Sequence, residues 1–260
     1  MSRDTPYACP LRSYRGAARP EEQVLQVVLE ESDLRIVFSS KADNEFMRDA
    51  LVAYVAKLRG EITLWMTLYP EFRSSLLPLP LPDKAPALVT AMYAAAQAMH
   101  VGPFAAVAGA IAQAAAEHTH QLLINGGLPG DVIVENGGDV FIISEVERVA
   151  ALLPDPENAS ELGILLKADD MPLGLCSSSG LIGHSLSFGH GNLATVRARN
   201  CALADAAATA YGNMLKNKKS VSLVLEQAER DQRKGIEGVF VQCEEQIGIW
   251  GNMELVPLSA

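Results

Sequence analysis

The spacing of apolar and polar positions predicts paired strands at the start of the chain, followed by a long helix. Apolar and β-branched residues dominate 24–30 and 34–40, and the short polar stretch between them predicts a hairpin. Over 42–59 the apolar residues recur near helical spacing, which predicts a helix. Gly60 and Pro70 are expected to interrupt the chain after it.

A proline-rich connection at 75–86 separates this region from two alanine-rich stretches. Residues 85–116 carry no charge, which superficially resembles a membrane span. Most of the apolar residues in this run are small alanines, however, and Gly102–Pro103 would break a helix in the middle of it. The pattern therefore favours two buried helices over a membrane segment.

The second half of the chain alternates short strands with helices. The clearest signal is 131–143, where Asn136–Gly137 between two apolar runs predicts a hairpin. Strands that pair as hairpins and helices that come in blocks are typical of an α+β fold, with a mostly antiparallel sheet packed against Ala-rich helices. No linker divides the chain, so 1–260 is expected to form a single domain. Further strands are predicted at 161–168, 193–199, 237–242 and 247–250, and further helices at 201–215 and 221–233.

Charge and cysteine content narrow the classes of function. The net charge is −10, from 31 acidic and 21 basic residues, so the chain as a whole repels phosphate backbones and nucleic acid is not an expected partner. The N-terminus has no apolar run typical of a signal peptide, and the thiols form no CxxC motif. These features predict a cytoplasmic protein without a disulfide framework. The four cysteines are Cys9, Cys176, Cys201 and Cys243.

Two glycine-containing segments are candidates for ligand binding. Gly102 and Pro103 open a helix, and free backbone N–H groups at such an end suit an anion, although taken alone the pair is more simply explained as a helix–helix turn. In the second segment, glycines let a ligand approach the backbone, but a hairpin turn also explains them and both interpretations stay open. The residues of this second segment are Asn136, Gly137, Gly138 and Asp139, preceded by Glu135.

A third segment, 176–190, is dense in serine, glycine and histidine. Small hydroxyl donors around glycines suit phosphate or hydroxyl recognition. A nucleophilic Cys176 paired with His184 is the competing interpretation, although most free cysteines are buried and inert. The candidate binding residues here are Ser177, Ser178, Ser179 and Gly180.

A fourth segment places Asp205 and Thr209 four residues apart on a predicted helix of small apolar residues. This spacing directs both side chains from one face, and a carboxylate with a hydroxyl suits Mg²⁺. The alternative is an acid that interacts with the dipole at its own helix N-terminus. His118 and His120 are not expected to bind a metal together, since side chains two residues apart on a helix point in different directions.

Four segments together resemble an uncharacterised prokaryotic family that is classed as ApbE-like, and the match covers nearly the whole chain. The segments are VGPFAAVAGAIA, VENGGDVFI, CSSSGLIGHSLSFG and CALADAAATAYGN. The wider resemblance, to the ApbE flavin transferases, covers about 130–215 and implies an ApbE-like, T-fold-like architecture.

The transferases bind FAD and transfer its FMN half to a threonine of a target protein. The resemblance implies that Asp205 and Thr209 bind Mg²⁺, that the turn at Gly138–Asp139 and the serine segment bind the cofactor, and that His184 is catalytic. His184 is followed here by Ser-Leu-Ser-Phe-Gly, without the Asp and Pro that follow it in the transferases.

Two classes of function follow from these features. The first is an enzyme or cofactor handler that binds FAD or another nucleotide with Mg²⁺, so that its partner is a small phosphate ligand. The second is a non-catalytic binding or delivery protein in sulfur assimilation, with Cys176 as the residue of interest. The Ala-rich helices can be buried within one chain or across a homodimer, and the sequence leaves both open.

Overall fold

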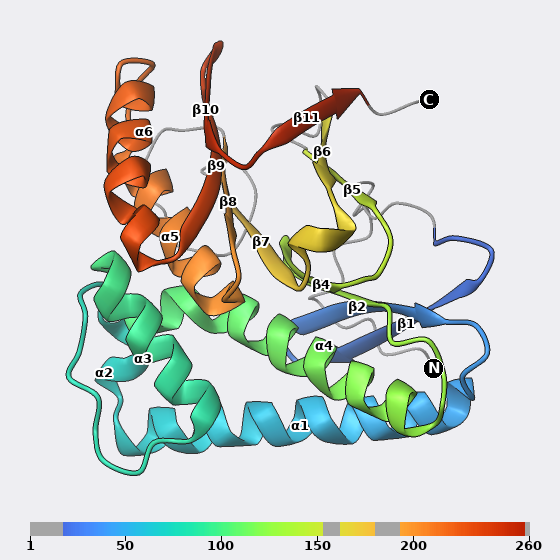
Figure 1. Cartoon of the computed structure of the whole chain (residues 1–260). Helices are drawn as coiled ribbons and strands as arrows, with labels where there is room; N and C mark the ends of the chain where they lie inside the picture. The colour runs from blue at the N-terminus through green and yellow to red at the C-terminus, as the bar shows by residue number, and fades with distance from the viewer. Residues whose placement is uncertain (1–17, 153–161, 180–192, 258–260) are drawn as a thin grey trace, which may run out of the picture.

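The computed structural model describes residues 18–152, 162–179 and 193–257. They form an eight-stranded antiparallel sheet in the order β1-β2-β3-β4-β7-β8-β9-β10 and a three-stranded sheet in the order β11-β6-β5 (Figure 1). The expected fold class, helices with a mostly antiparallel sheet, is confirmed. The predicted site residues Gly180 and His184 lie outside the described residues.

The N-terminal hairpin pairs β1 (Glu22–Leu29) with β2 (Ser32–Ser39) around a two-residue turn. Helix α1 (Asn44–Leu68) follows, and Asp43 caps it by accepting a hydrogen bond from the N–H of Phe46. The expected interruption at Gly60 is wrong, because α1 continues through it for two further turns. The apolar residues on either side of Gly60 keep one helical stripe buried, and this packing outweighs the low helix propensity of a single glycine.

The connection at 75–86 contains no helix or strand, as expected. After it come α3 (Ala87–Met99), the 3₁₀ turn η1 (Pro103–Ala106) and α4 (Val107–Asn125). Within the described chain no single helix is long and apolar enough to cross a membrane; the pair formed by α3 with η1–α4 passes on length and composition but is bent by 109°.

The remaining elements build the centre of the large sheet and cover it. Three strands, β5, β7 and β11, were not expected from the sequence, and the first residues of the serine segment belong to β7 rather than to a loop. The elements are α2 (Glu71–Ser74), β3 (Val132–Asn136), β4 (Asp139–Ile143), β5 (Arg148–Ala151), β6 (Leu162–Leu166), η2 (Ala168–Asp170), β7 (Leu173–Ser178), β8 (Leu193–Ala198), α5 (Cys201–Met214), α6 (Ser220–Asp231), η3 (Gln232–Lys234), β9 (Ile236–Cys243), β10 (Gln246–Gly251) and β11 (Glu254–Pro257).

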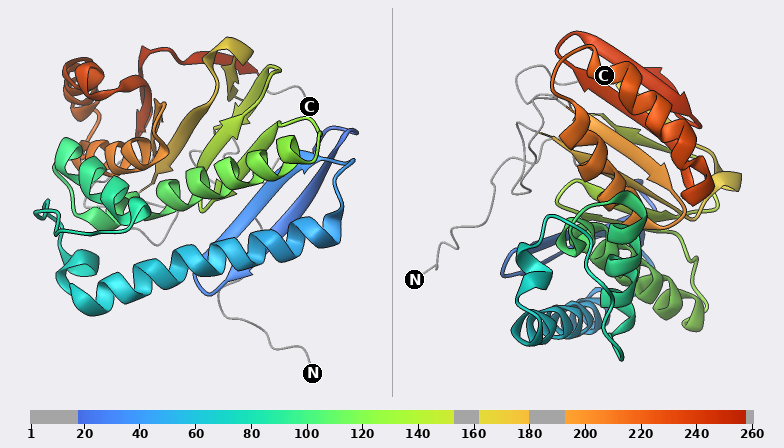
Figure 2. Two further views of the ribbon diagram at one scale, coloured as in Figure 1. Left: turned by 60° about the horizontal axis from the view of Figure 1, so that its bottom comes forward. Right: turned by 90° about the vertical axis from the view of Figure 1, so that its left-hand side faces the viewer.

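The two faces of the large sheet carry different cores. Helices cover one face, where α1 and α4 run side by side and α5 packs on β7 and β8 (Figures 1 and 2). The small sheet covers part of the other face. Alternation along each strand decides which core a residue joins: Phe141 and Cys176 face the helices, whereas the neighbouring Ile142 and Leu175 face the small sheet.

Candidate functional site

Helices α4 and α5 meet closely at the N-terminal turn of α4. A Cβ atom at Gly109 would lie 2.4 Å from the carbonyl oxygen of Cys201 and 2.8 Å from Cβ of Asp205. Only glycine allows so close an approach. The contact brings the first turns of α5 directly against the backbone N–H groups at the start of α4.

Asp205 uses this contact to bind the helix end. The Gly109 N–H donates to Asp205 Oδ2 at 2.8 Å, and the Ala108 N–H also donates to the carboxyl group. Part of the Asp205 residue stays accessible, but the carboxyl group is turned inward. One interpretation of Gly102 and Pro103 was an anion at the end of the helix that they open. In the structure the chain's own Asp205 carboxylate lies at the N-terminus of α4, at the dipole of this helix rather than of its own.

Asp139 approaches the same place from the sheet. It follows the turn at Gly137 and Gly138, whose φ angles are 70° and 106°, and it is the first residue of β4. Asn136, on the other arm of the hairpin, donates from Nδ2 to the carbonyl of Ala108 at 3.1 Å and so ties the turn to α4. The predicted hairpin is therefore present, and both of its polar end residues lie beside the α4 N-terminus.

The carboxyl group of Asp139 is buried and incompletely bonded. Burial raises its pKa to about 7; the Cys176 thiol and the Ser177 N–H, which donate to it, oppose this shift, and the charge of Glu135 adds to it. Its Oδ1 atom has no hydrogen-bond partner among the described residues. An orphaned buried carboxylate oxygen is costly unless a cation or donor reaches it.

Asp139 and Asp205 act on each other. Burial raises the pKa of Asp205 well above its ordinary value, and the charge of Asp139 raises it further, while the N–H groups of Gly109 and Ala108 oppose the shift. Neither acid forms an ion pair with a described lysine or arginine. Two buried acids that repel each other are an arrangement in which a bound cation would restore the charged forms.

Thr209 is buried one helical turn beyond Asp205 and on the same side of α5. No group of three or more His, Cys, Asp or Glu side chains in the described part of the chain is placed to hold a metal ion. A Mg²⁺ here would therefore take few protein ligands, and water or ligand phosphates would supply the others, which is the usual arrangement for this ion.

The serine segment divides between the two faces of the sheet. Ser177 Oγ is 2.9 Å from Thr195 Oγ1, on the face away from the helices. Ser178 alternates to the helix side, and its Oγ is buried with no hydrogen-bond partner within 18–152, 162–179 and 193–257. Ser179 is half-buried at the end of the described segment, and the predicted Gly180 and His184 lie outside it. Of the three serines, Ser178 is the one with an unused donor near Asp139.

Gly102 and Pro103 have surroundings of a different kind. Both are buried, and a Cβ atom at Gly102 would lie 1.7 Å from the carbonyl oxygen of Ser75. The glycine is thus required by the close approach of the 75–86 connection. These two residues shape the entry to α4, while the N–H groups that meet a carboxylate belong to Ala108 and Gly109.

A sequence model of the family described as "AbpE bacteria" matches residues 16–235. The chain belongs to this family. Two relatives have only the family-style name UPF0280 protein: one from Methanocaldococcus jannaschii is 31% identical over 236 residues, covering 89% of this chain and 92% of the relative. The other, from Methanothrix thermoacetophila, is 33% identical over 219 residues, covering 84% and 87%.

Solved structures with a similar fold carry the ApbE name as well. The flavin transferase ApbE from Vibrio cholerae superimposes with a TM-score of 0.56 at 11% identity, covering 88% of this chain and 96% of that one. The ApbE protein of Thermotoga maritima gives a TM-score of 0.56 at 14% identity, covering 89% and 97%. The resemblance inferred from the four segments is confirmed, and the fold of this family member is that of the ApbE proteins.

One feature of the family member could not be seen from the sequence, in which the thiols form no CxxC motif. Cys176, in β7, and Cys201, at the start of α5, are both fully buried and their Sγ atoms lie 3.4 Å apart. Burial raises the pKa of both thiols. The only available signal was that each cysteine opens one of the four family segments.

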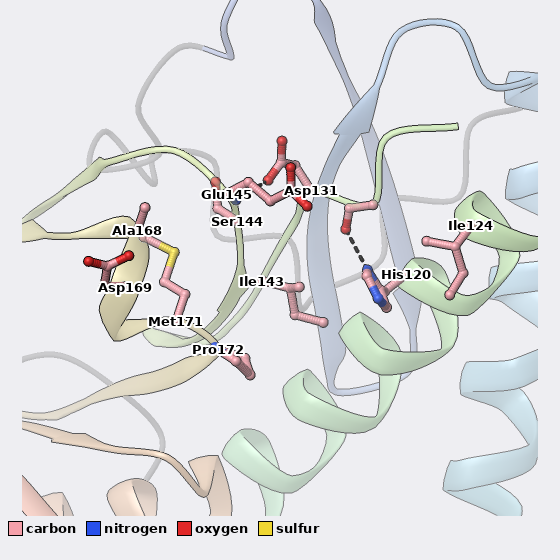
Figure 3. Close-up of a pocket in the computed structure, with 11 residues that line it drawn as sticks. His120, Ile124, Asp131, Ile143, Ser144, Glu145, Ala168, Asp169, Met171 and Pro172 are labelled. Atoms are coloured by element: carbon pink, nitrogen blue, oxygen red, sulfur yellow. Dashed lines mark hydrogen bonds between the residues drawn. The ribbon is translucent and has the colours of Figure 1, made fainter. Parts of the chain in front are cut away.

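A separate cavity of about 420 Å³ lies at the opposite end of α4 and of strands β4 and β7 (Figure 3). His120 borders it and its Nδ1 is 2.7 Å from the carbonyl oxygen of Gly130, while His118 stacks on Tyr54 at 3.9 Å between ring centroids. The two histidines thus have separate partners. The acids at this cavity are Asp131, Glu145 and Asp169.

Proposed function

We propose that this protein binds a flavin nucleotide together with Mg²⁺ beside Asp139 and Asp205, and that it transfers a flavin-derived group. The observation that carries the proposal is the pair of mutually repelling buried carboxyl groups, one with an orphaned oxygen, at the N-terminus of α4. The ApbE fold supports the flavin part, because the similar solved structures include proteins named flavin transferases.

The donor set fits Mg²⁺. Carboxylate oxygens from Asp205 and Asp139 and the hydroxyl of Thr209 are hard ligands of the kind this ion prefers. When bound, Mg²⁺ would neutralise the charge of a ligand's phosphates. Without it, two buried acids and a phosphate ligand would repel one another, so ligand binding and cation binding should depend on each other.

The protein's own groups would position the ligand. The N–H groups of Ala108 and Gly109 hold one side of the Asp205 carboxylate and so fix its direction. The unused hydroxyl of Ser178 is a candidate donor to a phosphate or ribityl oxygen. The two glycines of the β3–β4 turn have open space where a Cβ would stand, which leaves room for a ligand against the backbone.

The test is calorimetric titration of the purified protein with FAD, FMN and ATP, each with and without Mg²⁺. We expect binding of a flavin nucleotide that weakens at least tenfold without Mg²⁺ or in Asp205→Asn. Glu145→Gln, which removes an acid from the distant cavity, is the matched control and should bind as the natural sequence does. Absence of binding for all three nucleotides up to millimolar concentration would overturn the proposal.

The alternative of a sulfur carrier at Cys176 has less support from the structure. A carrier must expose its sulfur to a donor and an acceptor, and Cys176 is fully buried with a raised pKa. Alkylation of the native protein distinguishes the two functions. Rapid labelling of Cys176 before unfolding would favour the carrier.

A further inference from the structure

The contact between Cys176 and Cys201 joins two elements that are distant in sequence. Cys176 lies near the end of β7 and Cys201 is the first residue of α5. Their Sγ atoms are 3.4 Å apart, and Cys176 Sγ is also 3.4 Å from the carbonyl oxygen of Cys201. A disulfide requires about 2.05 Å between the sulfurs, so they need to approach by about 1.4 Å.

The packing around the two thiols holds them in contact. A Cβ atom at Gly174, two residues before Cys176, would lie 2.7 Å from Cα of Cys201, so strand and helix touch through backbone. The Cys201 N–H donates to Gln113 Oε1 at 2.8 Å, which anchors the first turn of α5 on α4. Neither sulfur can swing to solvent without disturbing these contacts, so each thiol has the other as its nearest reaction partner.

We propose that Cys176 and Cys201 form a reversible dithiol–disulfide pair that hydrogen peroxide, or another small hydroperoxide, oxidises. Both side chains are fully buried, which favours a water-sized oxidant over a bulky disulfide. Because burial raises the pKa of both thiols, only the small deprotonated fraction of either one attacks the peroxide; this gives a sulfenic acid and hydroxide, and the hydroxide takes up the thiol proton to become water. The second sulfur then displaces the sulfenic oxygen, which leaves as a second water as the S–S bond forms.

Oxidation of the two thiols would change the candidate site directly, because Cys176 contacts Asp139. The Cys176 thiol donates a hydrogen bond to the carboxyl group of Asp139. A disulfide has no S–H, so Asp139 loses this donor when the pair is oxidised. The cross-link would also tie β7, which neighbours Asp139, to α5, which carries Asp205. The inference does not depend on which ligand the site binds.

The experiment uses the full chain with Cys9→Ser, which leaves the three described thiols. The folded protein is treated with hydrogen peroxide, the peroxide is removed with catalase, and the protein is unfolded in iodoacetamide for mass spectrometry. We expect one alkylated cysteine, Cys243, and a cross-linked peptide that contains Cys176 and Cys201. Dithiothreitol before alkylation should restore all three thiols.

Single replacements separate this outcome from general oxidation. Cys176→Ala and Cys201→Ala should abolish the cross-link, whereas Cys243→Ala should keep it. Because the buried replacements could perturb folding, circular dichroism of each variant accompanies the mass measurement. Three alkylated thiols after peroxide, or added oxygen on Cys176 or Cys201 in place of the cross-link, would overturn the inference. Neither readout involves flavin, so it can fail or succeed independently of the proposed function.

Discussion

The two ends of helix α4 each gather acidic side chains, but they do so in opposite ways. At the N-terminal end, Asp139 and Asp205 are enclosed between strand and helix, and their pKa values are raised. At the C-terminal end, Glu145 and Asp169 are exposed and Asp131 half-buried around an open cavity (Figure 3). The same kind of side chain therefore lies in an enclosed site at one end of α4 and in an open one at the other.

Enclosure, rather than the number of acids, is therefore what creates a need for a cation at the N-terminal end. Water solvates the carboxylates at the open end at little cost. The enclosed pair lacks that solvation and repels itself, so protons or a metal ion must compensate. Substitutions of the acids at the enclosed end should therefore change both the unfolding free energy and cation binding. Substitutions at the open end should change neither.

The largest expected effect is the pH dependence that Asp139 contributes. Its folded-state pKa is raised from 3.8 to about 7, so the folded protein retains a proton that the unfolded chain releases. The stabilisation is complete below about pH 4 and is lost as the pH rises to about 7, on the order of 4 kcal/mol. Urea unfolding of the natural sequence and of Asp139→Asn at several pH values tests this. The contribution of Asp139 is the difference between the two proteins in how steeply the unfolding free energy changes with pH.

Mg²⁺ should reverse this trend, since it binds the charged form. Above about pH 7 added Mg²⁺ should raise the unfolding free energy of the natural protein but not of Asp139→Asn. Parallel pH profiles for the two proteins, with no response to Mg²⁺, would show that the acids at the α4 N-terminus are not a linked pair.

Gly109→Ala is expected to have the next largest effect. The added methyl would meet the Cys201 carbonyl oxygen at 2.4 Å and force α4 and α5 apart. We expect a loss of about 3 kcal/mol in unfolding free energy and loss of Mg²⁺-dependent ligand binding. Gly60→Ala is the control, because that helical glycine has nothing within 4 Å of an added Cβ and should gain up to about 1 kcal/mol. Equal stability of the two variants would contradict the close approach.

Asp205→Ala should cost less, about 2 kcal/mol, because it leaves the Gly109 N–H without its acceptor while removing a repelled acid. Asp205→Asn keeps an oxygen acceptor and should lose little stability. Both variants should lose Mg²⁺ binding in calorimetry. The separation of stability from binding in the Asn variant distinguishes a cation ligand from a purely structural helix cap.

Most of the fold could be predicted from local sequence patterns. The hairpins at β1–β2 and β3–β4 and the helices α4 and α5 follow from alternation, turn residues and apolar spacing. Three strands were missed: β5 and β11 are four residues each, and β7 has a glycine as its second residue and ends in two serines. Such strands are specified by partners across the sheet rather than by their own pattern.

The candidate site could be predicted as a set of motifs but not as an arrangement. Spacing along α5 correctly puts Asp205 and Thr209 on one side. It does not reveal that Asp205 bonds the N-terminus of α4, because this contact depends on Gly109, a glycine in the first turn of α4 with no local signature. The pairing of Cys176 with Cys201 depends on tertiary packing in the same way.

The smallest expected effects belong to the open end of α4. Asp131 Oδ1 accepts a hydrogen bond from the N–H of Glu145 at 2.7 Å, a contact that Asn can reproduce with its side-chain oxygen. Asp131→Asn and Glu145→Gln should therefore change the unfolding free energy by less than about 0.5 kcal/mol, since solvated surface acids contribute little. Neither should alter Mg²⁺ affinity. A loss of Mg²⁺ binding in either variant would mean that the open acids, rather than the enclosed ones, hold the ion, and it would move the site to the other end of the helix.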